Sequence, residues 1–354
     1  MEIDYICGYK TKEIFGMLKF QKNIQKILID VRFNKIEYPR ISRRSGILFN
    51  KFMKYFVYPL IVKKSITENN VKHIFSQEWG YLLNYIELDK SVINCYDLIP
   101  WVYENNHSFF WKLNIKGLNK ADKIITISEY SKNDIIKHLG YPEDRIHIIY
   151  PAVDHEHYFP NKSKEILKKF NINENEYVIL YVGSEQQRKN VPFLIKSFAI
   201  LKNNLPHVKL IKIGKPQKRG KREENLNLIS KLNLQNDILI IDTVPEADLP
   251  RYYNAADLFV YPSLYEGFGL PPLEAMACGC PVITSNTSSL PEVVGDAGIM
   301  FDPCDVDGLA DLMYTVLTNE ILKEDMSKKG LERAKLFTWE ISARNTLKIY
   351  EDLQ

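Results

Sequence analysis

Residues 263–279 read SLYEGFGLPPLEAMACG and directly follow the apolar run LFVYP. The run is typical of a buried strand, and the glycine-containing stretch after it predicts a loop. Pro271 and Pro272 fit the first turn of a helix, where missing amide hydrogens cost little. That helix continues through LEAMAC and is expected to stop at Gly279. A strand, a loop and a helix in this order predict an α/β fold.

Short apolar runs rich in β-branched residues alternate with helical-period segments along the whole chain. Runs of this kind are typical of parallel strands that are buried on both faces. Two sets of six predict two Rossmann-like, doubly wound domains of about 150 residues each. The runs are IDYIC, ILIDVRF, HIFSQ, VINCYD, KIITIS and IHIIYPA, followed by YVILYVG, VKLIKIG, ILIID, LFVYP, PVITS and AGIMF.

The stretch 150–172, YPAVDHEHYFPNKSKEILKKFNI, interrupts the alternation with two prolines and a polar run. We therefore predict an N-terminal domain over residues 1–160 and a C-terminal domain over residues 161–335. Ligands of open α/β sheets bind at the carboxyl ends of the strands. With two such domains facing each other, a central cleft between them is the expected site.

Composition excludes several classes of protein. The 354 residues are 45% hydrophobic and 26% charged, and 47 basic against 44 acidic residues give a net charge of only +3, which argues against a nucleic-acid partner. The five cysteines have no metal spacing and an odd count, so we expect reduced thiols packed as small apolar residues: Cys7, Cys95, Cys278, Cys280 and Cys304. Neither a signal peptide nor a long apolar window is apparent, which predicts a cytoplasmic protein.

The loop before the expected helix is suited to an anion. Glycine lets backbone approach a ligand closely, and the free amides at a helix N-terminus attract phosphate. Glu274 falls one turn into the helix, where it can bind a ribose diol, and Glu266 lies on the loop. The alternative is that both acids only decorate a helix terminus. The residues expected to line the phosphate are Gly267, Phe268, Gly269 and Leu270.

The motif EGFGLPPLEAMACGCPV resembles the E-x7-E signature of family-4 retaining glycosyltransferases, which have the GT-B fold. The likeness continues into SNTSSLPEVVGDAGIMFDP and back through VPEADLPRYYNAADLFVYPS. It implies that Glu274 binds the donor ribose and that Glu266 faces the transferred sugar. It also implies that the Gly-Phe-Gly-Leu amides contact the diphosphate and the sugar hydroxyls. By the same resemblance, residues 336–354 form a helix that crosses back to the first domain.

Arg188 and Lys189 lie in SEQQRKN, at the turn after the run YVILYVG. Two cations there would neutralise a departing diphosphate, although such a pair is also compatible with a solvated basic turn. In the family pattern an arginine often follows the strand glycine, and this chain has Ser184 there. Lys189 matches the family lysine, and Arg188 is the substitute cation.

We expect neither a metal ion nor a resident cofactor. The only Asp-x-Asp candidate, Asp305 and Asp307, opens a helical pattern, so one of the two is expected to be an N-cap. The co-substrate is expected to be a GDP- or UDP-linked sugar. The RKN turn and the stretch EGFGLPPLEAMA resemble those of mannosyltransferase-like members, which slightly favours a guanosine donor. By resemblance, Thr243 and Val244 lie against the nucleotide base.

The first half resembles the family only in outline. Related enzymes read His-Asp-Leu-x-Pro where this chain has Tyr96, Asp97, Leu98, Ile99 and Pro100. Tyr96 can still donate a hydrogen bond, but an unperturbed phenol is a poor base at neutral pH. Asp97 is expected to cap the turn.

Three further features of the first half complete the prediction. His107 is a weaker substitute for the family histidine. Gly16 is the counterpart of a glycine-rich family loop, and Ser128 and Ser131 are expected to cap a helix. Residues 32–64 mix Arg and Lys with Phe, Tyr and Ile. They fit either an amphipathic helix packed on a sheet or peripheral contact with the inner face of an anionic membrane.

The function that follows from these residues is retaining transfer of a hexose from a nucleotide-diphosphate sugar. The acceptor would be a hydroxyl of a glycan or of a lipid-linked glycan, and mannose is slightly favoured. Two alternatives stay open: a non-catalytic nucleotide-sugar-binding subunit, and a nucleotide-sugar epimerase on the same scaffold. A phosphorylase ranks lower, because it needs a cofactor lysine and a longer chain.

Overall fold

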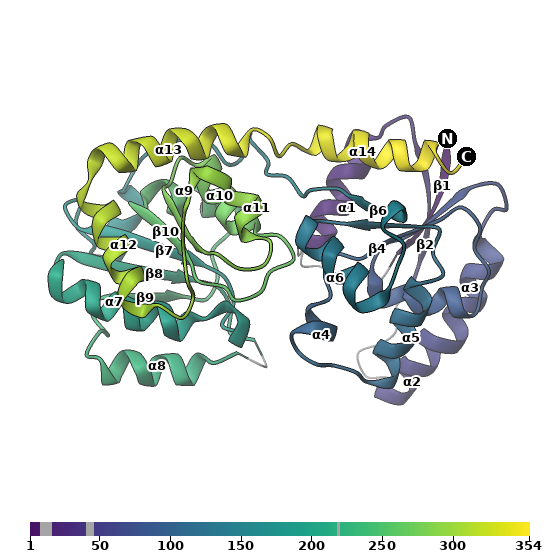
Figure 1. The fold of residues 1–354 in the computed structure, drawn as a ribbon, viewed down its shortest axis with the longest axis horizontal. Helices are drawn as coiled ribbons and strands as arrows, with labels where there is room; N and C mark the ends of the chain where they lie inside the picture. Colours follow the sequence, from purple (N-terminus) through teal and green to yellow (C-terminus); the bar gives the residue numbers. More distant parts are fainter. Residues whose placement is uncertain (8–15, 40–45, 218–219) are drawn as a thin grey trace. The chain divides into compact units, whose positions relative to one another are not determined.

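The computed structural model describes residues 1–7, 16–39, 46–217 and 220–354 (Figure 1). The chain forms two compact units. Unit 1 consists of Met1–Ala152 together with Trp339–Gln354, and unit 2 consists of Val153–Thr338. The sequence had placed these boundaries at residues 160 and 335. Each unit is described by itself.

Unit 1 contains a six-stranded sheet with the order β2-β1-β3-β4-β5-β6, and all neighbouring strands are parallel. The strands are β1 (Glu2–Cys7), β2 (Arg32–Glu37), β3 (Val71–Ile74), β4 (Ser91–Asn94), β5 (Lys123–Thr126) and β6 (Ile146–Ile148). The helices are α1 (Gly16–Ile27), α2 (Ile47–Phe52), the π-helical turn η1 (Met53–Val57), α3 (Tyr58–Ser65), η2 (Gln77–Asn84), α4 (Ile99–Val102), α5 (Phe109–Leu118), α6 (Glu129–Leu139), η3 (Glu143–Arg145) and α14 (Trp339–Glu351).

The two faces of this sheet differ in chemistry. On one face Ile6, Ile74 and Ile93 join an apolar core that includes Tyr58 from α3 and Leu82 from η2. The other face carries the alternate strand residues and is covered by α1 and α14, which contact each other. Side chains alternate between faces along a strand, so the apolar runs supply both cores at once. The C-terminal helix α14 is therefore an integral layer of unit 1.

Unit 2 contains a second parallel six-stranded sheet, with the order β12-β11-β10-β7-β8-β9. The strands are β7 (Tyr177–Val182), β8 (Val208–Ile213), β9 (Ile238–Ile241), β10 (Leu258–Tyr261), β11 (Val282–Ser285) and β12 (Ile299–Phe301). Read from β9, the strands follow the 3-2-1-4-5-6 order of dinucleotide-binding folds. The order reverses between β7 and β10, where ligand sites of such sheets form.

Helices cover both faces of this sheet. α7 contacts α8 and α12, whereas α10 contacts α9, α11 and α13. The bounds are η4 (Glu165–Phe170), η5 (Gln187–Lys189), α7 (Val191–Asn204), α8 (Arg222–Lys231), η6 (Glu246–Asp248), α9 (Leu249–Ala255), α10 (Leu270–Ala277), α11 (Leu290–Val294), η7 (Gly295–Ala297), α12 (Val306–Thr318) and α13 (Glu320–Ala334). None of the described helices is both long enough and apolar enough to cross a bilayer.

Two details of the prediction are wrong. The run ILIDVRF is not one strand, because Ile27 still belongs to α1 and the strand begins only at Arg32, after a turn. Cys304 is exposed, unlike the other four cysteines, because it lies in the turn before α12 rather than in an apolar run. The remaining eleven strands fall within or against their predicted runs.

The packing of α5 on η2 generates a test of unit 1. A Cβ atom on Gly117 would lie 1.8 Å from the carbonyl oxygen of Gly80, which is backbone and cannot rotate away. We expect Gly117→Ala to destabilise unit 1 by about 3 kcal/mol, or about 5–10 °C in melting temperature. Gly46→Ala is the matched control, since no atom of the described residues lies within 4 Å of its Cβ position. Equal melting temperatures for the two variants would contradict this packing.

Candidate active site

The reversal of strand order brings two loops of unit 2 together. Residues 183–190 follow β7, and residues 262–269 follow β10, its neighbour in the sheet. The carboxyl ends of parallel neighbours lie at the same edge, so both loops leave the sheet side by side. The amide of Leu264 donates to the carbonyl of Arg188 at 2.7 Å, which ties them directly.

A buried ion triplet joins these loops. Arg188 Nη1 donates to Glu266 Oε2 at 2.8 Å, and Lys189 Nζ donates to Glu266 Oε1 at 2.6 Å. Arg188 also donates to the carbonyl of Tyr265 at 3.0 Å, and Lys189 donates to the hydroxyl of Tyr261. The Glu266 side chain is only 9% exposed. The two cations predicted from SEQQRKN and the first glutamate of the motif thus form one cluster.

The charges of the triplet depend on one another. Burial alone would raise the pKa of Glu266, but the Lys189 ammonium and the Arg188 guanidinium outweigh it and hold that pKa below its usual range. Burial lowers the pKa of Lys189, and the nearby carboxylate opposes this effect. Glu266 is therefore ionised at neutral pH. With Lys189 protonated, the cluster has one positive charge in excess.

Hydroxyl groups from the last residue of β11 and from the segment after it hold the loop that carries Glu266. Ser285 and Thr287 both donate to the carbonyl of Ser263, Thr287 at 3.0 Å. The amide of Glu266 donates to Ser288 Oγ at 3.0 Å, and Ser289 Oγ donates to the Glu266 carbonyl at the same distance. The sequence analysis assigned no role to these hydroxyls. Their signal was the polar run SNTSS directly after a buried strand.

The N-terminus of α10 has the geometry that the sequence predicted. Gly269 has φ +133°, and a Cβ atom there would lie 2.9 Å from a methyl carbon of Leu290, so glycine is required. Prolines occupy the first turn, and Gly279 has φ +72° just after the helix. Phe268 is buried, with its ring edge against Phe337. α10 therefore begins directly after the Glu266 loop. Because Pro271 and Pro272 carry no amide hydrogen, the first-turn amide that α10 offers to a ligand is that of Leu270.

The second glutamate of the motif has its own support. Glu274 is half-buried, and its Oε2 accepts a hydrogen bond from the hydroxyl of Tyr253 at 2.9 Å. Tyr158 also hydrogen-bonds Glu274, and burial together with the carboxylate raises the pKa of both tyrosines. Neither tyrosine was singled out from the sequence. Two uncharged donors orient Glu274 without neutralising it, in contrast to Glu266.

Thr243 and Val244 follow β9, at the same edge of the sheet but one strand beyond β8. Thr243 is exposed and Val244 is half-buried. Beside them Arg222 binds Asp242 at 2.7 Å and the buried carboxylate of Glu185 at 2.8 Å. These contacts fix the surroundings of the two residues, and no described contact joins them to the ion triplet.

The remaining predicted residues lie in unit 1. Tyr96 is buried, and its hydroxyl accepts from Asn94 at 2.9 Å, while burial raises the pKa of the phenol. Asp97 Oδ1 accepts from the amide of Ile99 at 3.0 Å, which confirms its capping role. Gly16 is the first residue of α1, and most of the loop that precedes it lies outside the described residues. His107 is exposed, and its ring packs edge-on against Trp101 with the ring centroids 4.2 Å apart.

Two predicted helix caps are confirmed. Asp305 Oδ1 accepts from the amide of Gly308 at 2.9 Å at the start of α12. Ser128 accepts from the amide of Ser131 at 3.0 Å at the start of α6. Within the part of the chain that the structure describes, no three His, Cys, Asp or Glu side chains form a metal-binding group.

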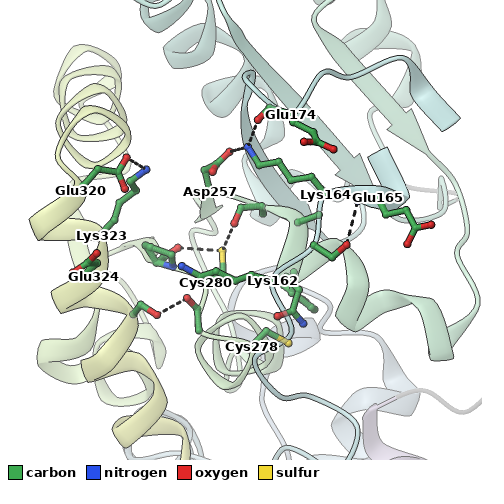
Figure 2. A pocket seen from close by; sticks show the side chains of 18 of the residues that line it. Lys162, Lys164, Glu165, Glu174, Asp257, Cys278, Cys280, Glu320, Lys323 and Glu324 are labelled. Atoms are coloured by element: carbon green, nitrogen blue, oxygen red, sulfur yellow. Dashed lines mark hydrogen bonds and ion pairs between the residues drawn. The ribbon is translucent and has the colours of Figure 1, made fainter. Parts of the chain in front are cut away.

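A hollow of about 680 Å³ lies at the opposite, amino edge of the unit 2 sheet, where Asp257 and Pro281 precede β10 and β11 (Figure 2). Three of its lysines are paired with acids of the same wall. The pairs are Lys164 with Asp257 at 2.9 Å, Lys168 with Glu174 at 3.3 Å and Lys323 with Glu320 at 2.6 Å. Because these charges satisfy each other, size alone does not make this hollow the active site.

Comparison with known proteins decides the family. Residues 162–333 match the family described as glycosyl transferases group 1, and residues 31–157 match glycosyltransferase family 4. The chain is 36% identical over 268 residues to O-antigen chain mannosyltransferase B of Escherichia coli, covering 74% of this chain and 68% of that protein. The chain belongs to the group 1 glycosyltransferase family.

One further relative and one solved structure are also similar to this chain. The chain is 32% identical over 265 residues to the serotype-specific mannosyltransferase WbdA of Escherichia coli, covering 71% of this chain but only 32% of WbdA. Anabaena Alr3699/HepE, solved in complex with UDP, superimposes with a TM-score of 0.82 at 16% identity, over 99% of this chain and all of that one. With two parallel six-stranded sheets, this likeness confirms the predicted GT-B fold class.

The ion triplet predicts a marked dependence of unit 2 on Glu266. Glu266→Gln leaves the ammonium of Lys189 buried without its anion, and we expect a loss of about 3–5 kcal/mol. Adding Lys189→Met to this variant should restore part of the loss, because the buried ammonium is then gone and the remaining cation, Arg188, still donates to the carbonyl of Tyr265. Urea unfolding measures each variant.

The control for this prediction is Glu332→Gln, which breaks an exposed pair with Lys335 and should change nothing measurable. If Glu266→Gln were as stable as Glu332→Gln, the triplet would not be a stabilising feature of unit 2.

Proposed function

We propose that this glycosyltransferase moves a hexose from a nucleotide-diphosphate sugar to a hydroxyl of a glycan or lipid-linked glycan. The observation that carries the proposal is the ion triplet of Arg188, Lys189 and Glu266, directly before the N-terminus of α10. In this proposal the two cations and the backbone of the loop that leads into α10 face the place where a diphosphate would develop charge.

In this proposal the residues of unit 2 bind the donor. The diphosphate lies against the amides of Gly267 to Leu270, and Arg188 and Lys189 face its oxygens. Glu266, held between the two cations, presents its remaining lone pairs to the hydroxyls of the transferred sugar. Glu274, oriented by Tyr253, accepts hydrogen bonds from the ribose diol, and Thr243 and Val244 contact the base.

We further propose that transfer retains the configuration of the sugar and needs no metal ion. The bond from the anomeric carbon to the diphosphate oxygen breaks, and the acceptor hydroxyl forms a new bond on the same face. The proton of that hydroxyl passes to an oxygen of the departing diphosphate. Positive charge from the triplet and the α10 amides would stabilise the leaving group, so the protein's work is positioning and electrostatics.

The donor is proposed to be a mannosyl nucleotide, with guanosine favoured over uridine. Two relatives from Escherichia coli are named as mannosyltransferases. The match to O-antigen chain mannosyltransferase B extends over 68% of that protein. Anabaena HepE was solved with UDP, which keeps uridine as the competing base. Direct titration distinguishes the two.

Calorimetric titration with GDP, UDP and ADP in EDTA tests the donor site. We expect one nucleotide to bind clearly best without metal, and Glu274→Gln to weaken it at least about tenfold, by loss of the hydrogen bonds to the ribose. Glu320→Gln, in the hollow at the amino edge, is the control and should bind like the wild type. Binding that requires a divalent ion would contradict the metal-free proposal.

Transfer itself distinguishes an enzyme from a binding subunit. GDP-mannose and UDP-glucose are offered with a panel of mannosylated acceptors, and products are analysed for anomeric configuration. An inverted product would contradict retention. Tight nucleotide binding without turnover of either donor would favour the non-catalytic subunit, and conversion of the donor sugar without transfer would favour an epimerase.

We also propose that unit 1 contacts an anionic membrane. Five large apolar side chains between residues 48 and 60 are 51–84% exposed, four of them at spacings of four residues. We call this set the apolar ridge: Leu48, Phe49, Phe52, Phe56 and Leu60. The opposite side of the same helices is buried through Tyr55, Tyr58 and Val62.

The ridge is carried by α2, η1 and α3, not by one helix over residues 32–64. These segments contain no acidic residue, and Lys51, Lys63 and Lys64 are exposed beside the ridge. A contiguous apolar stripe of this kind is unusual on a surface that faces only water. Together with the lysines it has the composition of an interfacial helix on anionic lipid.

Vesicle sedimentation tests the membrane contact. The wild type should bind phosphatidylglycerol-containing vesicles, and Phe52→Glu with Phe56→Glu should reduce binding at least about tenfold by placing charge in the acyl boundary. Ile321→Glu with Leu336→Glu changes two apolar residues of unit 2 that are at least as exposed as Phe52, and this pair is the matched control. Equal loss in both pairs, or equal binding to purely zwitterionic vesicles, would contradict the proposal.

A further inference from the structure

Four buried side chains of unit 1 form a continuous row of hydrogen bonds. The Tyr350 hydroxyl lies 2.6 Å from His73 Nδ1, His73 Nε2 lies 3.0 Å from Asn94 Oδ1, and Asn94 Nδ2 lies 2.9 Å from the Tyr96 hydroxyl. None of the four is more than 3% exposed. Burying this many polar groups is costly unless they satisfy each other, so the row needs an explanation.

The sheet places this row on the face that α1 and α14 cover. His73 pairs in register with Tyr5 and Val92, so their side chains point the same way. Asn94 is two residues beyond Val92 and Tyr96 is two residues beyond Asn94, which keeps them on this face. Tyr350 reaches it from α14. The row therefore runs from the sheet interior to the carboxyl edge, where ligands of such sheets bind.

The chemistry of the groups gives the row one direction. An amide oxygen only accepts, so His73 must carry its hydrogen on Nε2. Burial lowers the pKa of His73 to about 4, which leaves Nδ1 bare at neutral pH to accept from Tyr350. An amide nitrogen only donates, so the oxygen of Tyr96 accepts from Asn94. Every step thus donates toward Tyr96.

One hydrogen remains at the end of the row. Tyr96 keeps its phenolic hydrogen, since burial raises the pKa of that phenol, and no group among the described residues accepts it. The rings of Phe20 and Phe75 pack edge-on against Tyr96 and restrict its rotation. A phenol has one hydrogen, so this hydroxyl can donate to a single oxygen atom.

We infer that Tyr350, His73 and Asn94 are positioning residues that make Tyr96 a one-way hydrogen-bond donor to one sugar oxygen at the carboxyl edge of unit 1. This inference rests on the proposed function. The oxygen belongs either to the acceptor glycan or to the transferred hexose. Both present the same chemistry, and the experiment distinguishes them.

The decisive variant is Asn94→Asp. A carboxylate accepts only, so it takes the phenolic hydrogen of Tyr96 and removes the outward donor while the other three side chains of the row remain. We expect kcat for transfer to fall about tenfold, as in Tyr96→Phe, and by less in Tyr350→Phe. Nucleotide affinity should stay unchanged in all three. Tyr141→Phe, which removes a buried hydroxyl bonded to the Ala121 carbonyl, is the control for a merely structural effect.

Hydrolysis of the donor without acceptor identifies the oxygen. If only transfer falls, the oxygen is on the acceptor, and if hydrolysis falls in parallel, it is on the transferred sugar. Either pattern supports the inference. Wild-type transfer by Tyr96→Phe or by Asn94→Asp would overturn it.

A readout independent of activity completes the test. In protein labelled with ¹⁵N-histidine, the His73 signal, assigned by its loss in His73→Gln, should report a neutral ring with the hydrogen on Nε2 between pH 8 and 5.5. The groups that face it, Tyr5, Asn94 and Tyr350, are uncharged. A hydrogen on Nδ1 of His73 would overturn the inferred direction of the row. A wild type that transfers no sugar would instead overturn the proposed function, and the spectrum would still decide the direction of the row.

Discussion

A carboxylate buried between two cations sets the conditions for much of unit 2. Removing Glu266 from water is unfavourable unless Arg188 and Lys189 both stay within hydrogen-bonding distance, as they do at 2.8 and 2.6 Å. The cations come from the turn after β7 and the acid from the loop after β10, so those strands must be neighbours. The strand order and the triplet therefore require each other. The hydroxyls of residues 285–289 then fix the loop so that the carboxylate cannot swing into solvent.

The sequence predicted the members of this cluster but not their contacts. Glu266, Gly269 and Glu274 could be predicted because their spacing around a helix that begins with prolines is a local pattern. Arg188 and Lys189 were found as a basic turn after a strand. Their pairing with Glu266 joins residues 77 and 78 positions apart and depends on strand order, which periodicity does not encode. The same reason hid Tyr253, whose hydroxyl meets Glu274 only through the packing of α9 on α10.

In unit 1 the strands were predictable and their polar content was not interpreted. The elements VKHI and SVIN are buried throughout, yet each contains polar residues at strand positions. Buried polar side chains in a parallel strand need partners from elsewhere, and for His73 the partner is Tyr350, 277 positions away. The late start of β2 at Arg32 has a different cause. Ile27 is the last residue of α1 and Leu28 follows it directly, so these two apolar residues end a helix and do not begin a strand. Apolar character alone does not separate these outcomes.

The two units handle polarity in opposite ways, and this contrast fits the division of labour in the proposed reaction. The full charges at the site of unit 2 suit the leaving diphosphate of the proposed reaction, which is itself charged and needs cations to face it. In the hydrogen-bond row of unit 1, burial suppresses ionisation: the pKa of His73 falls to about 4, and the pKa values of Tyr96 and Tyr350 rise. A sugar hydroxyl is neutral, so a neutral donor with a fixed direction can recognise its oxygen without the cost of burying a charge. That is a physical reason for a buried row of neutral hydrogen bonds in place of an ion pair.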